Sequence, residues 1–125
     1  MKVVASVVAS AAVVAGALIV APPAEAATYY GAIVYQSRNG NVQSGIFRDY
    51  GSSTKMIVDI QRKWPDAGYI TFSSGSCAAV VRYRNDISSG WTKGRGSTMD
   101  AASSRALNSA SGLGRKWLVR AACQG

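Results

Sequence analysis

An internal duplication constrains the fold of this chain more than any other feature of its sequence. Residues 31–77 align with residues 78–123 at an offset of 45 to 47 residues (44 falls on 89, 31 on 78), and each copy ends at a cysteine. Two copies are too few for a solenoid, whose repeats stack in longer arrays. The duplication therefore predicts one pseudo-symmetric domain built from two similar halves.

Each half predicts the same local structure. An apolar, β-branched run (30–35 and 78–83) passes through a turn at Asn39-Gly40 or Asn85-Asp86 into a return strand, because these residue types tolerate the backbone of a tight turn. A Gly and Ser cluster then precedes a helix and a short closing strand. We expect an α+β fold of two β-β-α-β units, forming a largely antiparallel six-stranded sheet with two helices on one face.

The two predicted helices differ in the size of their apolar residues. The first begins at an N-cap of Ser52 or Ser53 and ends before Pro65, and the second begins at Ser97 and ends at Gly112. Large side chains follow one face of the first helix, whereas alanines dominate the second, so we expect the second helix to approach the sheet closely. The two stripes are Met56, Ile57, Ile60, Trp64 and Ala102, Ala106, Leu107, Ala110.

The first 26 residues have the composition of a secretory signal peptide. Lys2 supplies the positive start, residues 3–21 are almost wholly apolar, and a small-x-small motif places cleavage between Ala26 and Ala27. A retained membrane anchor is the alternative, because the apolar run is long enough to cross a bilayer.

Two prolines argue against that anchor. Pro22-Pro23 interrupts a helix just before the cleavage motif, and no stop-transfer cluster of basic residues follows. We therefore expect a secreted, extracellular, monomeric protein whose single domain covers residues 27–125.

Cys77 and Cys123 are the only cysteines in the chain. An even number of cysteines in an exported protein predicts a structural disulfide. It would close a loop of 46 residues (123 − 77), which the chain-entropy model values at about 4 kcal/mol. A reactive thiol pair is the alternative, but the close spacing of redox motifs is absent, and a metal site needs more ligands.

The acid-base side chains exclude several classes of enzyme. The chain has no His, and its only Glu, Glu25, lies in the predicted signal peptide. This excludes a His-dependent triad, a His-ligated metal and a paired-Glu hydrolase. No spacing brings two of the five Asp together or singles out a Ser-Lys dyad. We expect no enzymatic activity, no metal and no cofactor.

The basic excess is concentrated in the second half of the chain. Residues 78–125 hold eight basic and two acidic side chains, whereas residues 27–77 hold five and three. Alternate residues of a strand share a face, so Arg82 lies beside Arg84, and Lys116 is expected on the same face as Arg120. We expect a basic patch on the helix-free face of the sheet, made of Arg82, Arg84, Lys93, Arg95, Lys116 and Arg120.

Such a patch attracts phosphates or acidic cell-envelope polymers through counterion release, although the same charge can serve solubility alone.

The roles of two further features stay open. Trp91 is either a core residue or an exposed platform, whereas Trp64 and Trp117 are expected in the core. The glycine-rich segment 90–98 either captures an anion at Ser97 and Thr98 or only turns a strand into a helix.

Three functions fit these observations. The first is a binding module for an anionic partner, either an envelope polymer or nucleic acid. The second is a secreted effector or inhibitor that contacts another protein through the hairpin tips at Asn39-Gly40 and Asn85-Asp86. The third is a structural component of the cell envelope.

Several segments resemble a known bacterial family. They are the strand 30–35, the segment 74–81, the Gly90-Trp91 pair, the helix pattern from Asp100 to Leu107 and the closing Cys123. Over residues 29–123 the chain resembles the secreted family catalogued as domain of unknown function 4189. The resemblance implies a small exported domain with paired cysteines. The additional cysteines of many members are absent here, where Trp64 and Ser111 stand, and no catalytic residue is carried over.

Overall fold

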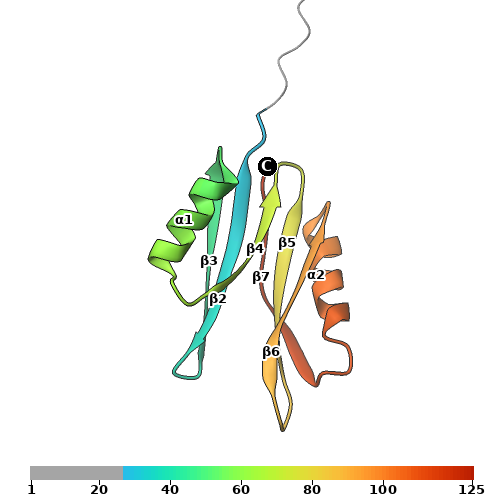
Figure 1. Cartoon of the computed structure of the whole chain (residues 1–125). Helices are drawn as coiled ribbons and strands as arrows, with labels where there is room; N and C mark the ends of the chain where they lie inside the picture. Colours follow the sequence, from blue (N-terminus) through green and yellow to red (C-terminus); the bar gives the residue numbers. More distant parts are fainter. Residues whose placement is uncertain (1–26) are drawn as a thin grey trace, which may run out of the picture.

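Figure 1 shows the computed structural model of the protein, which describes residues 27–125. The predicted signal peptide, residues 1–26, lies outside the described residues. The predicted cleavage between Ala26 and Ala27 therefore stays a prediction.

Two units with the same order of elements make up the described chain. The first unit contains strands β2 (Tyr30–Arg38) and β3 (Asn41–Tyr50), helix α1 (Ser53–Lys63) and strand β4 (Gly68–Ser73). The second contains strands β5 (Cys77–Arg84) and β6 (Ser89–Gly96), helix α2 (Met99–Ser109) and strand β7 (Arg115–Cys123). The β-β-α-β order predicted for each half is therefore present in both.

The strands form two antiparallel sheets of three, in the orders β3-β2-β4 and β6-β5-β7. The predicted α+β fold with six strands and two helices is confirmed. Its arrangement is different from the predicted single sheet with both helices on one face. Each sheet carries its own helix on its outer face, and the two inner faces pack together, so the layers run α1, first sheet, second sheet, α2 (Figure 1).

The central strands explain this layering. Every residue of β2 from Gly31 to Tyr35 is buried, and so is every residue of β5 from Cys77 to Arg82. A strand with an unbroken buried run needs a covering layer on both of its faces. A single sheet with helices on one face would leave half of each run in water, whereas two packed sheets cover both halves.

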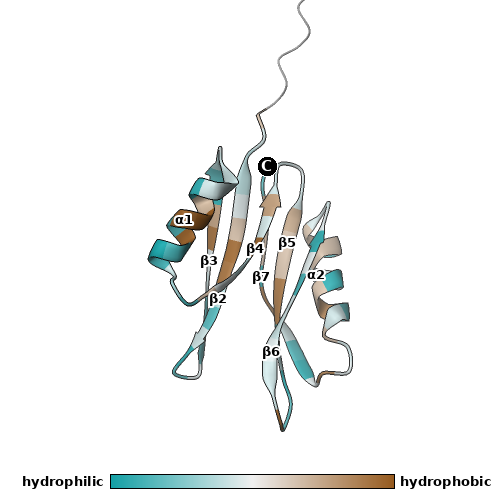
Figure 2. Cartoon of the chain, viewed as in Figure 1, coloured by the Kyte–Doolittle hydropathy of each residue, from teal (hydrophilic) through white to brown (hydrophobic). Residues whose placement is uncertain are grey.

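Three apolar clusters fill the spaces between the layers, and Figure 2 shows apolar bands on α1, β2 and β5. The cluster between the sheets contains Ile33, Tyr35, Ile70, Phe72, Ala78, Val80 and Ala122. The cluster under α1 contains Ala32, Val34, Met56 and Ile60. The cluster under α2 contains Cys77, Ala79, Val81, Ala102, Ala106 and Ala110.

Side-chain oxygens cap both helices. Ser52 Oγ accepts a hydrogen bond from the Lys55 amide at 3.2 Å, as predicted. In α2 the cap is Thr98, whose Oγ1 accepts from the Ala101 amide at 3.1 Å, and not the predicted Ser97.

Helix α2 lies close to its sheet, as its alanine stripe predicts. A Cβ atom added at Gly94 would lie only 2.5 Å from the Ala102 carbonyl oxygen and 2.5 Å from the Ala106 amide nitrogen. Glycine at this position of β6 is therefore what allows the two backbones to approach.

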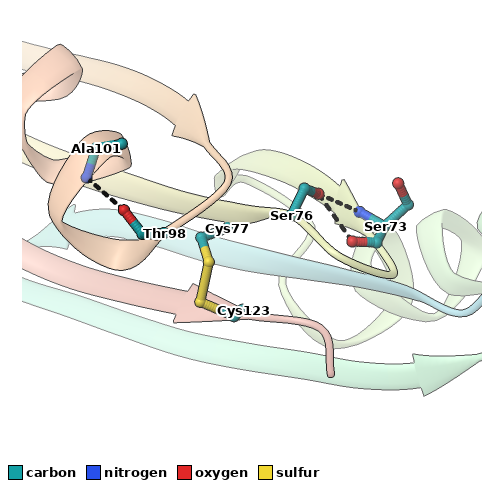
Figure 3. Close-up of a disulfide and its surroundings, with 6 residues drawn as sticks. All are labelled: Ser73, Ser76, Cys77, Thr98, Ala101 and Cys123. Carbon is teal, nitrogen blue, oxygen red and sulfur yellow. Dashed lines mark hydrogen bonds between the residues drawn. A yellow bond between two sulfur atoms is a disulfide. The ribbon is translucent and has the colours of Figure 1, made fainter.

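The predicted disulfide between Cys77 and Cys123 is present (Figure 3). The two residues lie opposite each other on β5 and β7, with their Cα atoms 4.0 Å apart. Both belong to the second unit, so the disulfide joins two strands of one sheet and does not link the two units. Beside it, Ser76 Oγ accepts from the Ser73 amide at 3.0 Å and stabilises the turn between the units.

Gln124 links the end of the chain to the first unit. Its Nε2 donates to Asp49 Oδ1 at 2.8 Å, and its Oε1 accepts from the Asp49 amide at 2.9 Å. Asp49 has a φ of 65°, in the left-handed region that non-glycine residues seldom adopt. The two hydrogen bonds hold Asp49 in this conformation and fasten β3 to the second unit.

Candidate functional site

The register of the second sheet gathers cationic side chains on its inner face, the face that packs against the first sheet. Paired residues of neighbouring antiparallel strands point to the same face, and Val80 points inward into the cluster between the sheets. Across β6, β5 and β7 the inward rows are Arg95-Ala78-Ala122, Lys93-Val80-Arg120, Trp91-Arg82-Trp117 and Ser89-Arg84-Arg115. We call the six cations of these rows the cation face: Arg82, Arg84, Lys93, Arg95, Arg115 and Arg120.

Five of the six predicted anion-binding residues belong to the cation face, and Lys116 does not. The Lys116 ammonium donates to the Leu107 carbonyl at 3.1 Å, on the side of the sheet that α2 covers. Arg115 was not predicted for the patch, because only the register of β7 shows that Arg115 and Trp117 lie on the face of Arg82.

A β-bulge in β7 is the reason that Lys116 is separated from Arg120. Arg120 pairs with Val80 and Leu118 pairs with Val81, so Val119 between them has no partner. One extra residue reverses the alternation of side chains beyond it. The expected common face for Lys116 and Arg120 is therefore wrong.

The first sheet covers the middle of the cation face. The prediction that these cations lie on an open side of the sheet is therefore wrong. At one edge Arg95 Nε donates to the Thr71 carbonyl of β4 at 2.7 Å. At the other edge Arg120 Nε donates to Ser44 Oγ of β3 at 3.1 Å. Lys93 lies on the same edge strand as Arg95, and Arg82 lies on the central strand β5. Arg84 and Arg115 lie at the hairpin end of the second sheet.

Arg82 is the one buried cation of the face, at 8% exposure. Its guanidinium lies 4.6 Å from the Trp91 ring centroid, and its NH2 donates to Ser89 Oγ at 3.2 Å. The Trp91 ring also packs against Tyr35, with centroids 4.7 Å apart. Trp91 is thus half-buried and packed against the core between the sheets, and its ring is not a free platform.

A second arginine lies over a tryptophan ring near the β5–β6 hairpin end of the sheet. The Arg115 guanidinium lies 5.3 Å from the Trp117 ring centroid. Cation–π contact stabilises a guanidinium without neutralising its charge. Both arginines therefore lie beside an aromatic ring, and neither forms an ion pair with an acid of the described residues.

A groove lies where β6 faces β4, beside helix α2. It has a volume of about 640 Å³. Three cations line it: Lys93 and Arg95 of β6, and Arg105 of α2. The Arg105 NH1 donates to the Arg95 carbonyl at 3.0 Å. We call this the β4–β6 groove; its other side chains include Asn108 and Ser109. Sequence reasoning missed Arg105 because helix spacing alone does not show which strand edge a helical residue reaches.

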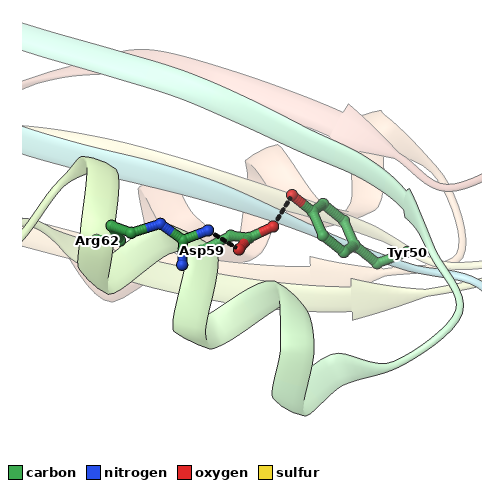
Figure 4. A network of polar contacts seen from close by, with 3 residues as sticks. All are labelled: Tyr50, Asp59 and Arg62. Atoms are coloured by element: carbon green, nitrogen blue, oxygen red, sulfur yellow. Dashed lines mark hydrogen bonds and ion pairs between the residues drawn. The ribbon is translucent and has the colours of Figure 1, made fainter.

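No acidic side chain of the described residues forms an ion pair with the cation face. Between residues 27 and 125 the one ion pair joins Arg62 to Asp59, in the first unit (Figure 4). Tyr50 OH also donates to Asp59 Oδ2 at 2.9 Å. This hydrogen bond, with a smaller contribution from Arg62, holds the pKa of Asp59 below its usual value, and the same bond raises the pKa of Tyr50.

Anion capture at Ser97 and Thr98 stays a prediction. Thr98 Oγ1 accepts the hydrogen bond from the Ala101 amide that caps α2, and this contact leaves the hydroxyl hydrogen of Thr98 able to donate. The glycine-rich segment also carries β6 past α2, as the contacts at Gly94 indicate.

Within the described residues, no group of three or more acidic or Cys side chains is placed to hold a metal ion. No helix in residues 27–125 is long and apolar enough to cross a membrane.

Comparison with known proteins adds no relative: no family model matches the chain, and no curated protein and no solved structure is significantly similar to it.

Proposed function

We propose that this protein is an exported binding module for an anionic partner, an envelope polymer or a nucleic acid, and that it is not an enzyme. The resemblance to the exported family supports the export, and the disulfide fits an oxidising compartment. The absence of His and of any Glu after residue 26 removes the commonest general bases from the described chain.

The observation that carries the proposal is the register of the second sheet. It places six cations and two tryptophans on one face, and no acid of the described chain forms an ion pair with any of the six. Like charges on one rigid surface repel each other, and a bound polyanion relieves that repulsion while releasing its own counterions.

Salt-dependent binding to immobilised heparin tests the proposal. The oxidised protein, purified from cells that export it, should be retained at low ionic strength, with log K falling linearly as log salt rises. The double variant Arg84→Gln/Arg115→Gln should elute at lower salt and show a shallower slope. Protein that passes through the column at low ionic strength would contradict the proposal.

A matched variant controls for net charge in this experiment. Arg48→Gln/Lys55→Gln removes the same two charges from exposed positions of β3 and α1 in the first unit. It should elute close to the wild type. Equal effects of the two double variants would mean that net charge, and not the cation face, causes retention.

A second candidate function, contact with another protein, is favoured by the β5–β6 hairpin tip. Ile87 at this tip is 94% exposed. Asn85 holds the tip rigid, since its Oδ1 accepts from the Ile87 amide at 3.0 Å and its Nδ2 donates to the Leu113 carbonyl at 2.6 Å. An isoleucine presented on an ordered loop is suited to enter an apolar pocket of a partner.

Pull-down from culture medium with wild type and Ile87→Asp separates this second candidate from the first. A defined protein retained by the wild type and lost with Ile87→Asp would support it. Retention that is unchanged by the substitution, or no retained protein, would contradict it.

A further inference from the structure

We propose that the β4–β6 groove is a binding site for the chain of an acidic polysaccharide, with Lys93 and Arg105 contacting its carboxylates. This inference rests on the proposed function and deepens it, because it names both the place on the cation face and the chemical class of the ligand.

The two arginines of the groove are already positioned for a ligand. Arg95 is fixed by its hydrogen bonds to Thr71, and Arg105 is fixed through NH1 by the Arg95 carbonyl. Nε and NH2 of Arg105 and the Lys93 ammonium make no hydrogen bond within the described residues and remain available as donors. A guanidinium held in this way binds a carboxylate with little further loss of side-chain freedom.

Uncharged polar groups lie beside these cations. The Asn108 amide makes no side-chain hydrogen bond among the described residues, and Ser109 Oγ donates to the Arg105 carbonyl at 2.9 Å while its lone pairs stay available. A sugar carrying both a carboxylate and hydroxyl groups can use both kinds of partner. A plain polyphosphate offers no hydroxyl hydrogens for these acceptors.

The groove continues along β4 towards the disulfide end, which favours a polymer over a single small anion. Towards the disulfide end a hollow of about 310 Å³ shares Thr71 and Arg95 with it. Towards the hairpin end lies a separate hollow of about 530 Å³, which shares no residue with the groove and includes Asp66 beside Gly68 and Trp91. The six residues of β4 span about 20 Å, a length that accommodates several linked sugars.

An added peptide strand fits this edge poorly. Strand addition needs the free backbone groups of an edge strand. On β4 the Thr71 carbonyl is occupied by Arg95, and the Ser73 amide and carbonyl are both occupied by Ser76 Oγ. These contacts interrupt the row of groups with which an incoming strand would pair.

Single-stranded nucleic acid is also disfavoured at this site. Its usual binding combines cations with aromatic rings on which bases stack. The Tyr69 side chain packs into the cluster under α1, on the other face of the first sheet. The Trp91 ring is contacted by Tyr35 and Arg82. The groove therefore offers charges and hydrogen bonds but no free aromatic face.

Titration calorimetry with the full oxidised protein tests the inference, using an octamer of galacturonic acid as the probe. The octamer should bind, and Lys93→Gln/Arg105→Gln should weaken its binding by about tenfold or more, as expected for loss of charge-assisted hydrogen bonds. The second variant Asn108→Ala should weaken it several-fold without changing the net charge. Circular dichroism melts confirm that each variant is folded.

Three comparisons decide between the possible outcomes. The control Arg48→Gln/Lys55→Gln should change octamer affinity by less than about twofold, because both charges lie in the other unit. If the control weakens binding as much as the groove variant, or if neither variant does, the groove is not the site, while the proposed function stands. If a dodecamer of deoxythymidylate binds more tightly and is lost with the groove variant, the ligand class is wrong. If the protein binds none of the three, the octamer, the dodecamer or heparin, the proposed function fails as well.

Discussion

The two units share one strand order, yet they fill corresponding positions with side chains of opposite character. The N-caps Ser52 and Thr98 are 46 residues apart and set the correspondence (98 − 52). At this offset the buried Met56 and Ile60 of α1 correspond to Ala102 and Ala106 of α2.

The strands under the helices also differ in the size of their side chains, which are larger in the first unit. Phe47 stands opposite Ala32 in the first sheet, where Gly94 stands opposite Ala79 in the second. The first unit therefore packs its helix with large side chains, and the second brings its helix closer and adds a disulfide. Burial of small residues contributes less hydrophobic stabilisation, so the disulfide supplies a larger share of the stability of the second unit.

Charge differs between the units as clearly as size does. Asp59 of α1, paired with Arg62, corresponds to Arg105 of α2, which points to the β4–β6 groove (105 − 59 = 46). The inward rows of the first sheet include Ile46-Ile33-Ile70 and Ser44-Tyr35-Gly68, without a cation, whereas the second sheet carries the cation face. The comparison teaches that two units with one order of elements can differ in chemistry, one with apolar inward rows and the other with the cation face.

Removal of the disulfide should have the largest effect on this comparison. The double variant Cys77→Ala/Cys123→Ala should lose about 4 kcal/mol of unfolding free energy, since the bridge closes 46 residues. Urea unfolding measures the loss. Amide hydrogen exchange should rise first in β5 and β7, and faster exchange confined to β2 and β3 would show that the bridge does not serve the second unit in particular.

Truncation of the large core residue of α1 should come next. Met56→Ala should cost about 3 kcal/mol, because it removes a fully buried side chain and leaves a cavity. The corresponding Ala102→Gly should cost about 1 kcal/mol, chiefly through helix propensity. Thermal or urea unfolding of both variants gives the ratio, and equal losses would contradict the difference in packing between the units.

Enlargement of the close contact under α2 should have a somewhat smaller effect. Gly94→Ala should cost about 2 kcal/mol, because the new methyl group meets backbone atoms of α2 and forces the helix outward. Gly51→Ala is the matched control, since a Cβ there would meet no atom within 4 Å. The same unfolding measurement checks both, and a Gly94→Ala protein as stable as the control would show that α2 can shift freely.

The smallest effect should come from the polar network of the first unit. Tyr50→Phe removes the hydrogen bond to Asp59, so the pKa of Asp59 should rise towards its usual value of 3.8. A carboxylate with a lowered pKa in the folded state stabilises the protein above its unfolded pKa, and this is lost as the pH falls through the folded pKa. Wild type and variant should therefore differ in stability above about pH 4 and converge below it.

Carbon NMR of the Asp59 carboxyl group, with titration from neutral to acid pH, gives the shift directly. An unchanged pKa in Tyr50→Phe would mean that Arg62 alone holds it low.

Much of the fold follows from local sequence signals. The duplicated pattern, the Asn39-Gly40 turn, the Ser52 cap and the paired cysteines each act over a few residues or depend on residue type alone, so the sequence predicts them. The site is different, because it depends on how strands are aligned. The bulge at Val119 moves Lys116 off the cation face, and no residue type marks that bulge. The approach of Arg105 to β6 likewise follows from where α2 rests on Gly94.

The sequence by itself determined the α+β class, the two β-β-α-β units, the disulfide and the concentration of basic residues in the second half, because periodicity, turn chemistry and composition are written along the chain. Only the tertiary structure decided that there are two sheets of three, that the cations line their edges, and that β4, β6 and α2 form a groove. These features arise where segments distant in sequence meet, and the meeting is governed by the need of both central strands to be covered on both faces.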